Sequence, residues 1–152
     1  MNSLPIVIQN FLNSNLYHPC LLLVHPQIER LQAAADELLG LYGWPRLLIG
    51  RELSDALLLV EPKRRAQKAA RWLDDRLNDF KPGPLLCTDI DLLFEPSLRL
   101  DPVTLLSSAS RTTRMVALWP GTHNSGALAY AVPEHAHYRT WRNPQLPIEA
   151  LG

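Results

Sequence analysis

Short apolar runs alternate along this chain with longer segments in which apolar residues recur every three or four positions. Residues 18–24 contain a compact apolar run between two prolines, which is typical of a buried strand. Residues 28–42 then carry apolar side chains at helical spacing, and Gly40 and Gly43 end that pattern. Residues 47–50 indicate a second short strand, and Ser54 is expected to cap a brief helix that reaches residue 60.

The second half of the chain repeats the alternation. Pro62 is well placed to begin a helix that ends near residues 82–83, and residues 85–88 indicate the third strand. Asp101 and Pro102 open another helix that runs to about residue 110. Residues 115–119 and 127–132 are the fourth and fifth strand candidates, separated by an Asn-Ser-Gly turn.

Strands alternating with helices predict an α/β fold with a parallel sheet of about five strands flanked by helices. We expect one domain over residues 1–141, beginning with a short lead-in, and an extended or flexible tail over residues 142–152. Ligands of such sheets bind at the carboxyl ends of the strands. The candidate site is therefore the rim formed by His25, Asp89, Asp91 and Pro120.

The composition indicates which partners the chain is not expected to attract by charge and in which cell compartment we expect it. Of 152 residues, 15 are Lys or Arg and 15 are Asp or Glu, so the overall charge predicts no attraction to DNA or to a membrane. Cys20 and Cys87 lie in apolar runs and are expected to be free buried thiols. With neither a signal-peptide pattern nor an apolar stretch of about 20 residues, the chain is expected to be cytoplasmic.

The turn after the first strand is where an ATPase would place a phosphate loop. Such a loop uses glycines, whose backbone N–H groups surround phosphate oxygens, and a lysine that neutralises charge. This chain has His25, Pro26 and Gln27 at that position, no glycine before Gly40 and no lysine before Lys63. His25 is a candidate for a phosphate contact, and the alternative is a polar residue at the rim of the sheet.

Residues after the third strand suggest the acidic half of a nucleotide site. Asp89 and Asp91 follow an apolar run, and carboxylates at a strand end can bind Mg²⁺ through water. The same pattern arises wherever a buried strand reaches solvent. We therefore expect no resident cofactor, and treat ATP with Mg²⁺ as the ligand to test.

Arginines and lysines form two further candidate sites. Arg111 and Arg114 flank the start of the fourth strand, where ATPases present an arginine to a neighbouring subunit's phosphate; for Arg111, a cation at a helix C-terminus is the alternative. Arg64, Lys68 and Arg71 share one helical face that could contact nucleic-acid phosphates or simply be solvated.

His135 and His137 could bind a metal ion, although the sequence offers no evident third ligand. We expect no metal site. Trp119, Tyr130, Tyr138 and Trp141 are expected to be packing residues. The serines at positions 107, 108 and 110 lack the strand-turn-helix setting of a hydrolase nucleophile.

Several segments, in this order and spacing, resemble a known family. They are residues 50–58 (GRELSDALL), 63–66 (KRRA), 89–94 (DIDLLF), 100–106 (LDPVTLL), 110–111 (SR), 119–121 (WPG), 128–131 (LAYA), 133–135 (PEH) and 138–139 (YR). Together they closely resemble BrxF, the family of small P-loop proteins of BREX phage-defence systems, over roughly residues 18–142.

The resemblance implies an ASCE/AAA-like P-loop core that works beside a large ATPase, a DNA methyltransferase, a phosphatase-like protein and a helicase. It also implies a glycine-lysine phosphate loop, which this chain lacks, and it aligns Thr88 with the family's magnesium aspartate and Asp91 with its acidic partner. These departures predict a non-catalytic or weakly nucleotide-binding subunit that contacts protein partners. The alternatives are an NTPase whose ATP site is completed by a partner subunit and a DNA-binding adaptor that uses the basic face of Arg64, Lys68 and Arg71. In the leading interpretation, any contact with DNA is indirect.

Overall fold

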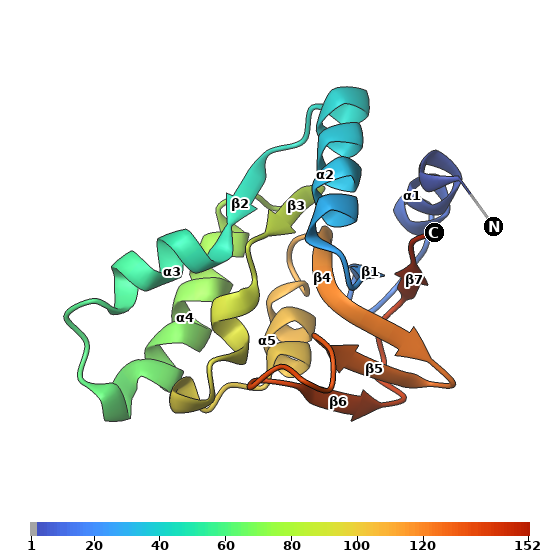
Figure 1. Ribbon diagram of the computed structural model, residues 1–152. Coiled ribbons are helices and arrows are strands. Elements are labelled where there is room, and N and C mark those ends of the chain that lie inside the picture. Colours follow the sequence, from blue (N-terminus) through green and yellow to red (C-terminus); the bar gives the residue numbers. More distant parts are fainter. Residues whose placement is uncertain (1–2) are drawn as a thin grey trace.

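The computed structural model describes residues 3–152 and shows an α/β fold (Figure 1). Its helices are α1 (Leu4–Leu12), α2 (Ile28–Tyr42), α3 (Ile49–Leu57), α4 (Arg65–Asn78) and α5 (Pro102–Ala109), with 3-10 turns η1 (Pro62–Arg64), η2 (Asp91–Phe94) and η3 (Pro96–Leu98). Its strands are β1 (Cys20–His25), β2 (Arg46–Leu48), β3 (Leu85–Thr88), β4 (Met115–Asn124), β5 (Ala127–Tyr130), β6 (Arg139–Arg142) and β7 (Ile148–Ala150).

Five strands form a parallel sheet in the order β2-β3-β4-β1-β7. Strand β4 continues past this sheet and pairs antiparallel with β5, which pairs antiparallel with β6. The predicted mostly parallel sheet flanked by helices is therefore confirmed.

The fifth parallel strand is not the one that the sequence pattern suggested. Residues 127–132 follow β4 after a tight turn, and a parallel neighbour would need a crossover of a dozen or more residues. They return as the antiparallel strand β5 instead. The position beside β1 belongs to β7, from the segment predicted to be an extended or flexible tail; the N–H of Leu151 donates to the carbonyl of Val24 at 2.9 Å.

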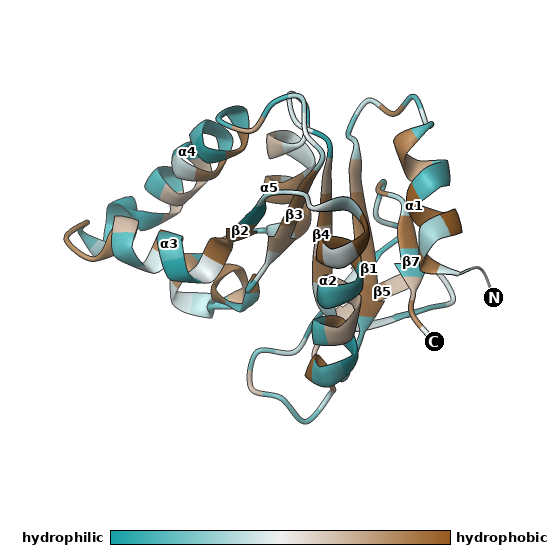
Figure 2. Ribbon diagram, turned by 90° about the horizontal axis from the view of Figure 1, so that it is seen from above, coloured by the Kyte–Doolittle hydropathy of each residue, from teal (hydrophilic) through white to brown (hydrophobic). Residues whose placement is uncertain are grey.

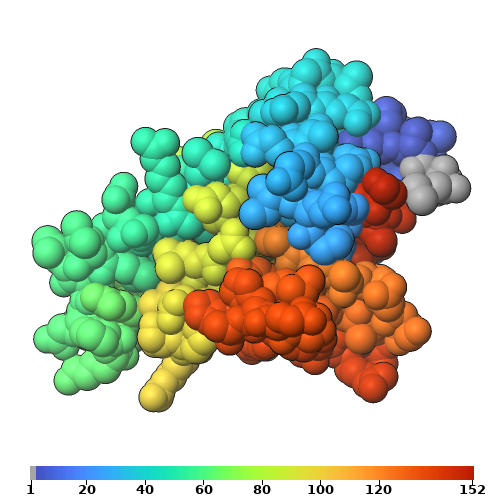
Figure 3. All heavy atoms as spheres, in the orientation of Figure 1, coloured from blue at the N-terminus to red at the C-terminus, as the bar shows by residue number. Residues whose placement is uncertain are grey.

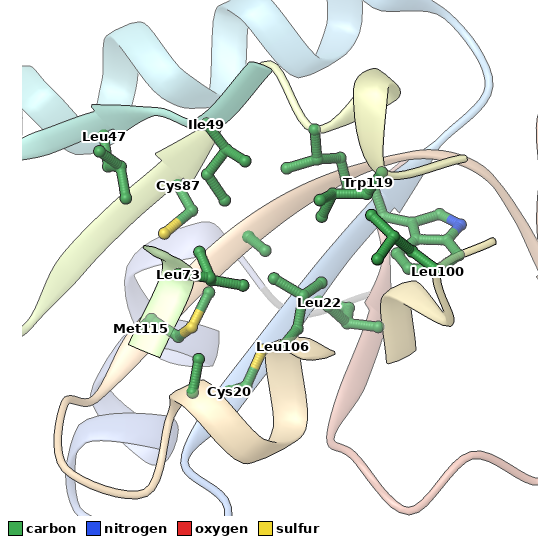
Figure 4. Close-up of a cluster of buried hydrophobic side chains, with 14 of the residues drawn as sticks. Cys20, Leu22, Leu47, Ile49, Leu73, Cys87, Leu100, Leu106, Met115 and Trp119 are labelled. Atoms are coloured by element: carbon green, nitrogen blue, oxygen red, sulfur yellow. The ribbon is translucent and has the colours of Figure 1, made fainter. Parts of the chain in front are cut away.

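Side chains alternate between the two faces of the sheet and form two cores. On one face, Leu22, Cys87 and Met115 pack with residues of α3, α4 and α5 (Figure 4). On the other face, Leu21, Leu23 and their neighbours pack against α1 and α2. Both faces of the central strands are thus apolar, as expected of a buried parallel sheet, and β1, β3 and β4 appear mostly brown in the middle of the molecule in Figure 2.

Two local predictions differ from the structure. The lead-in contains α1, whose Leu4, Ile8 and Phe11 are buried in the second core. The predicted helix start at Ser54 is wrong: α3 already begins at Ile49, and Ser54 is an exposed residue within it. The groups that satisfy the start of α3 come from the distant residue Asp89, so the local sequence does not reveal them.

The predicted free thiols are confirmed, because Cys20 and Cys87 are both buried and unpaired. Burial raises the pKa of the Cys20 thiol from 9.0 to about 12 and also raises that of Cys87. Between residues 3 and 152, no helix is both long and apolar enough to cross a membrane.

Candidate functional site

The turn between β1 and α2 is too short to surround a phosphate. Only Pro26 and Gln27 separate the last residue of β1 from the first residue of α2, whereas a phosphate loop spans about eight residues. The N–H of Gln27 donates to Nδ1 of half-buried His25 at 3.0 Å, so the turn closes on its own histidine. Proline at position 26 has no N–H to offer a ligand.

Asp89, at the end of β3, supports the first turn of α3. Its backbone carbonyl accepts from the N–H of Gly50 at 2.6 Å, and its carboxylate oxygen Oδ2 accepts from the N–H of Arg51 at 2.9 Å. These two N–H groups have no partner within their own helix, so Asp89 acts as a cap supplied from another segment. Asp89 adopts φ +58°, which aspartate tolerates better than most residues.

Gly50 makes this approach possible. A Cβ atom at position 50 would lie 2.8 Å from the Asp89 carbonyl oxygen and 3.0 Å from its Oδ2. Any larger residue would therefore force the end of β3 away from the start of α3.

Asp91 holds the hairpin that extends from β4. Its Oδ1 accepts from the Tyr130 hydroxyl at 2.6 Å. Two causes raise the pKa of Tyr130 well above its usual range: burial is the larger, and the hydrogen bond to the Asp91 carboxylate is the smaller. The hydroxyl therefore remains protonated and continues to donate to Asp91.

Aromatic rings complete this anchor. Phe94 stacks on Tyr130 with 3.6 Å between ring centroids and meets Trp119 edge-on at 4.9 Å. The indole N–H of Trp119 donates to the carbonyl of Ala129 at 2.9 Å. The predicted packing role of Trp119, Tyr130 and Trp141 agrees with this cluster, which Trp141 joins at 5.2 Å from Trp119. Tyr138 is 38% exposed and lies outside it.

Thr88 has a partner that the sequence analysis missed. The Arg46 Nε donates to Thr88 Oγ1 at 2.9 Å, across the paired strands β2 and β3. Arg46 therefore places a cation next to the acidic end of β3. No local pattern marks this residue, because the contact depends on which strands pair.

Two adjoining hollows lie at the rim and share Ile28, Asp89 and Asp91. The smaller, of about 220 Å³, runs between α2 and the end of β3 and includes Arg46 and Thr88. The larger, of about 680 Å³, is open to solvent and reaches Glu95, His135 and His137. The surrounding segments, α2 in blue, the residues after β3 in yellow and those after β5 in orange-red, meet on the face shown in Figure 3.

His135 and His137 lie at the outer wall of the larger hollow. The N–H of His137 donates to Nδ1 of His135 at 2.9 Å, and Nε2 of His137 lies 3.9 Å from Oε2 of Glu95. The N–H and hydroxyl of Ser97 lower the pKa of Glu95. Across the described residues 3–152, no three His, Cys, Asp or Glu side chains are arranged to hold a metal ion.

Arg111 and Arg114 lie at the opposite end of the sheet from this rim, because both precede β4. Exposed Arg111 donates from Nε to the carbonyl of Ser108 at 3.1 Å, so it is a cation at the C-terminus of α5. The guanidinium of Arg114 donates to the carbonyl oxygens of Phe11 at 2.7 Å and Ser14 at 3.0 Å, so it fixes the end of α1.

The basic residues Arg64, Lys68 and Arg71 also lie away from the rim. They are exposed on η1 and α4 and line a separate groove with Leu59 and Val60. The structure thus brings together His25, Asp89 and Asp91 at one edge, and leaves the other candidates on different surfaces.

Chemically, the rim offers two carboxylates, each with one oxygen already bonded to a protein group, and a β1–α2 turn without the glycines of a phosphate loop. Such an arrangement suits the anchoring of loops better than phosphate binding. Comparisons of this chain with protein-family models, with curated proteins and with solved structures found no match.

Proposed function

We propose that this chain is a P-loop-type subunit that has lost its phosphate loop and serves as a structural or regulatory component of a BREX-type anti-phage complex. Its partners would be the large ATPase, the methyltransferase, the phosphatase-like protein and the helicase that the family resemblance implies. It would work in the cytoplasm and would bind neither ATP nor Mg²⁺ as a resident cofactor.

The observation that carries this proposal is the two-residue turn between β1 and α2. Binding the β- and γ-phosphates of a nucleotide requires several inward-pointing N–H groups and a cation, usually lysine. Here Pro26 has no N–H group, and the N–H of Gln27 is bonded to His25.

The strand order supports the P-loop part of the proposal. Another parallel strand, β4, lies between β1 and the acidic strand β3. This order is the one expected of the ASCE-type core that the resemblance implies.

The segments that carry the resemblance also converge in space. Those at residues 50–58, 89–94, 119–121 and 128–131 meet through the contacts of Asp89 with α3 and of Phe94 with Trp119 and Tyr130. These contacts maintain the architecture of the rim and need no nucleotide. A family pattern can therefore persist in a chain whose phosphate loop is gone.

The test of nucleotide binding is thermal unfolding with 1 mM ATP and Mg²⁺, set against unfolding in Mg²⁺ alone. A ligand present at 100 times its Kd stabilises by about 2.7 kcal/mol, which for a chain of this length raises the Tm by about 5–11 °C. We expect a rise of less than about 1 °C on that scale. The variant Asp89→Asn keeps an oxygen that can cap α3. A larger rise in Tm that disappears in this variant would overturn the proposal that the chain has lost nucleotide binding.

The test of the partner role is co-purification of the tagged chain with the four kinds of defence protein that the resemblance implies, with and without ATP. We expect one or more of them to be retained in both conditions. Recovery of the isolated chain alone would contradict the partner role. ATP turnover that appears only in the assembled complex and is lost in Asp91→Ala would instead establish the alternative of a site completed by a partner.

A further inference from the structure

The corner between α3 and α4 combines exposed leucines with arginine and lysine side chains. We define the α3–α4 corner as Leu58, Leu59, Val60, Arg64, Lys68 and Arg71. It projects from the sheet as the brown tip beyond the end of α3 in Figure 2 and lies at the far left of Figure 1.

The exposure of the two leucines is unusual. Leu58 is 72% exposed and Leu59 is 96% exposed, although their neighbour Leu57 is buried in the core. Covering such a side chain on binding removes its apolar area from water, which favours association.

Hydrogen bonds hold the corner in shape. The N–H of Val60 donates to the carbonyl of Leu57 at 3.0 Å, and Nε of Arg65 donates to the carbonyl of Val60 at 2.9 Å. These two bonds join Val60 to the end of α3 and to the start of α4, and the turn between them presents Leu59 to solvent. A pre-organised surface binds with less loss of conformational entropy.

Cations line the groove next to these leucines. Arg64, Lys68 and Arg71 follow one another at i, i+4 and i+7, and the groove that they line with Leu59 and Val60 has a volume of about 450 Å³. Within residues 3–152, none of the three has a carboxylate within salt-bridge distance. Glu61 is the single carboxylate that lines the groove.

We infer that the α3–α4 corner docks an acidic, amphipathic helix of a partner protein, whose apolar side chains cover Leu58 and Leu59 while its carboxylates pair with Arg64, Lys68 and Arg71. This inference rests on the proposed function only in that the occupant is a protein. The cations of the groove favour a partner helix with one acidic face, and the exposed leucines favour one whose other face is apolar.

Two features favour a protein over a nucleic acid. A phosphate backbone would place its charges against the apolar surface of Leu59 and against Glu61. The groove residues also include no aromatic side chain on which a base could stack.

The experiment compares two fluorescent 16-residue helical peptides with the same leucines, one carrying glutamates and the other lysines. We expect anisotropy to show binding of the glutamate peptide alone, weakened at least tenfold by Leu59→Ser and by the double variant Arg64→Glu/Lys68→Glu. The matched controls are Leu41→Ser, on α2, where Leu41 is 55% exposed, and Arg142→Glu, on exposed β6. Both should leave the affinity unchanged.

Several results would overturn the inference. They are equal binding of the lysine peptide, no binding of the glutamate peptide, insensitivity to the corner variants, or tighter binding to a 16-base-pair DNA duplex or to anionic phosphatidylserine vesicles. A dimer of this chain that Leu59→Ser dissociates would also overturn it.

The same variants separate this inference from the proposed function. If the defence proteins co-purify with wild type and with the corner variants alike, the proposed function stands and the corner inference fails. If the glutamate peptide binds as expected but no defence protein is retained, the corner inference stands and the proposed function fails.

Discussion

Two turns at the same rim of the sheet have very different roles in the fold. The β1–α2 turn is short and is closed by one hydrogen bond between Gln27 and His25. The segment after β3 caps α3 through Asp89 and anchors the β4–β5 hairpin through Asp91 and Phe94. Carboxylates at a strand end therefore do not by themselves identify a ligand site, because their oxygens can be occupied by the protein's own donors.

The largest expected difference between the two turns is in packing. Phe94→Ala removes a ring that is 1% exposed and contacts Tyr130 and Trp119. We expect the free energy of unfolding in urea to fall by about 3–5 kcal/mol. Gln27→Ala, in the other turn, removes an exposed side chain and should change it by less than about 0.5 kcal/mol. Similar losses in the two variants would show that the turns are equally integrated.

A pH-dependent effect concerns what the two turns share, namely the buried strands behind them. Burial raises the pKa of Cys20, in β1, from 9.0 to about 12, and also that of Cys87, in β3. The folded state thus holds both protons more tightly than the unfolded chain. The contribution of the two thiols to the free energy of unfolding should be fully present below about pH 9. Above that pH, the free energy of unfolding should fall by about 1.4 kcal/mol per pH unit for each thiol.

Urea unfolding at pH 8, 10 and 11 measures this loss. Tyr130, whose pKa is also raised, adds to the loss above the value of about 10 at which an unfolded tyrosine ionises. Cys20→Ala should reduce the slope by the contribution of one thiol, even if it lowers stability at every pH. If the free energy of unfolding of Cys20→Ala fell with pH as steeply as that of wild type, the buried Cys20 thiol would not contribute to the loss.

The smallest effect tests the two polar residues that lie next to helix starts. Asp89→Ala removes the oxygen that caps α3 and should cost about 1 kcal/mol. Asp89→Asn keeps an acceptor and should recover most of that loss. Gln27, the N-cap residue of α2, makes no side-chain capping bond, so Gln27→Ala provides the matched control. If Asp89→Ala were as mild as Gln27→Ala, the capping role of Asp89 would be refuted.

Local patterns in the sequence determined much of the fold. The helix predicted over residues 28–42 is α2, and the strand predicted over residues 85–88 is β3. Asp101 caps α5 as predicted, since its Oδ1 accepts from the N–H of Thr104 at 3.3 Å. These features depend on periodicity and on side chains within a few residues of one another, which a sequence displays directly.

The absence of a phosphate loop was also evident from the sequence alone, because it depends on which residues follow one strand. Tertiary structure decided the rest. The places of β5 and β7, the capping of α3 by Asp89, and the contact between Arg46 and Thr88 all join segments far apart in the chain. A local pattern indicates which residues can form a strand or cap a helix. Which distant partner meets them is decided only when the sheet and its two cores assemble.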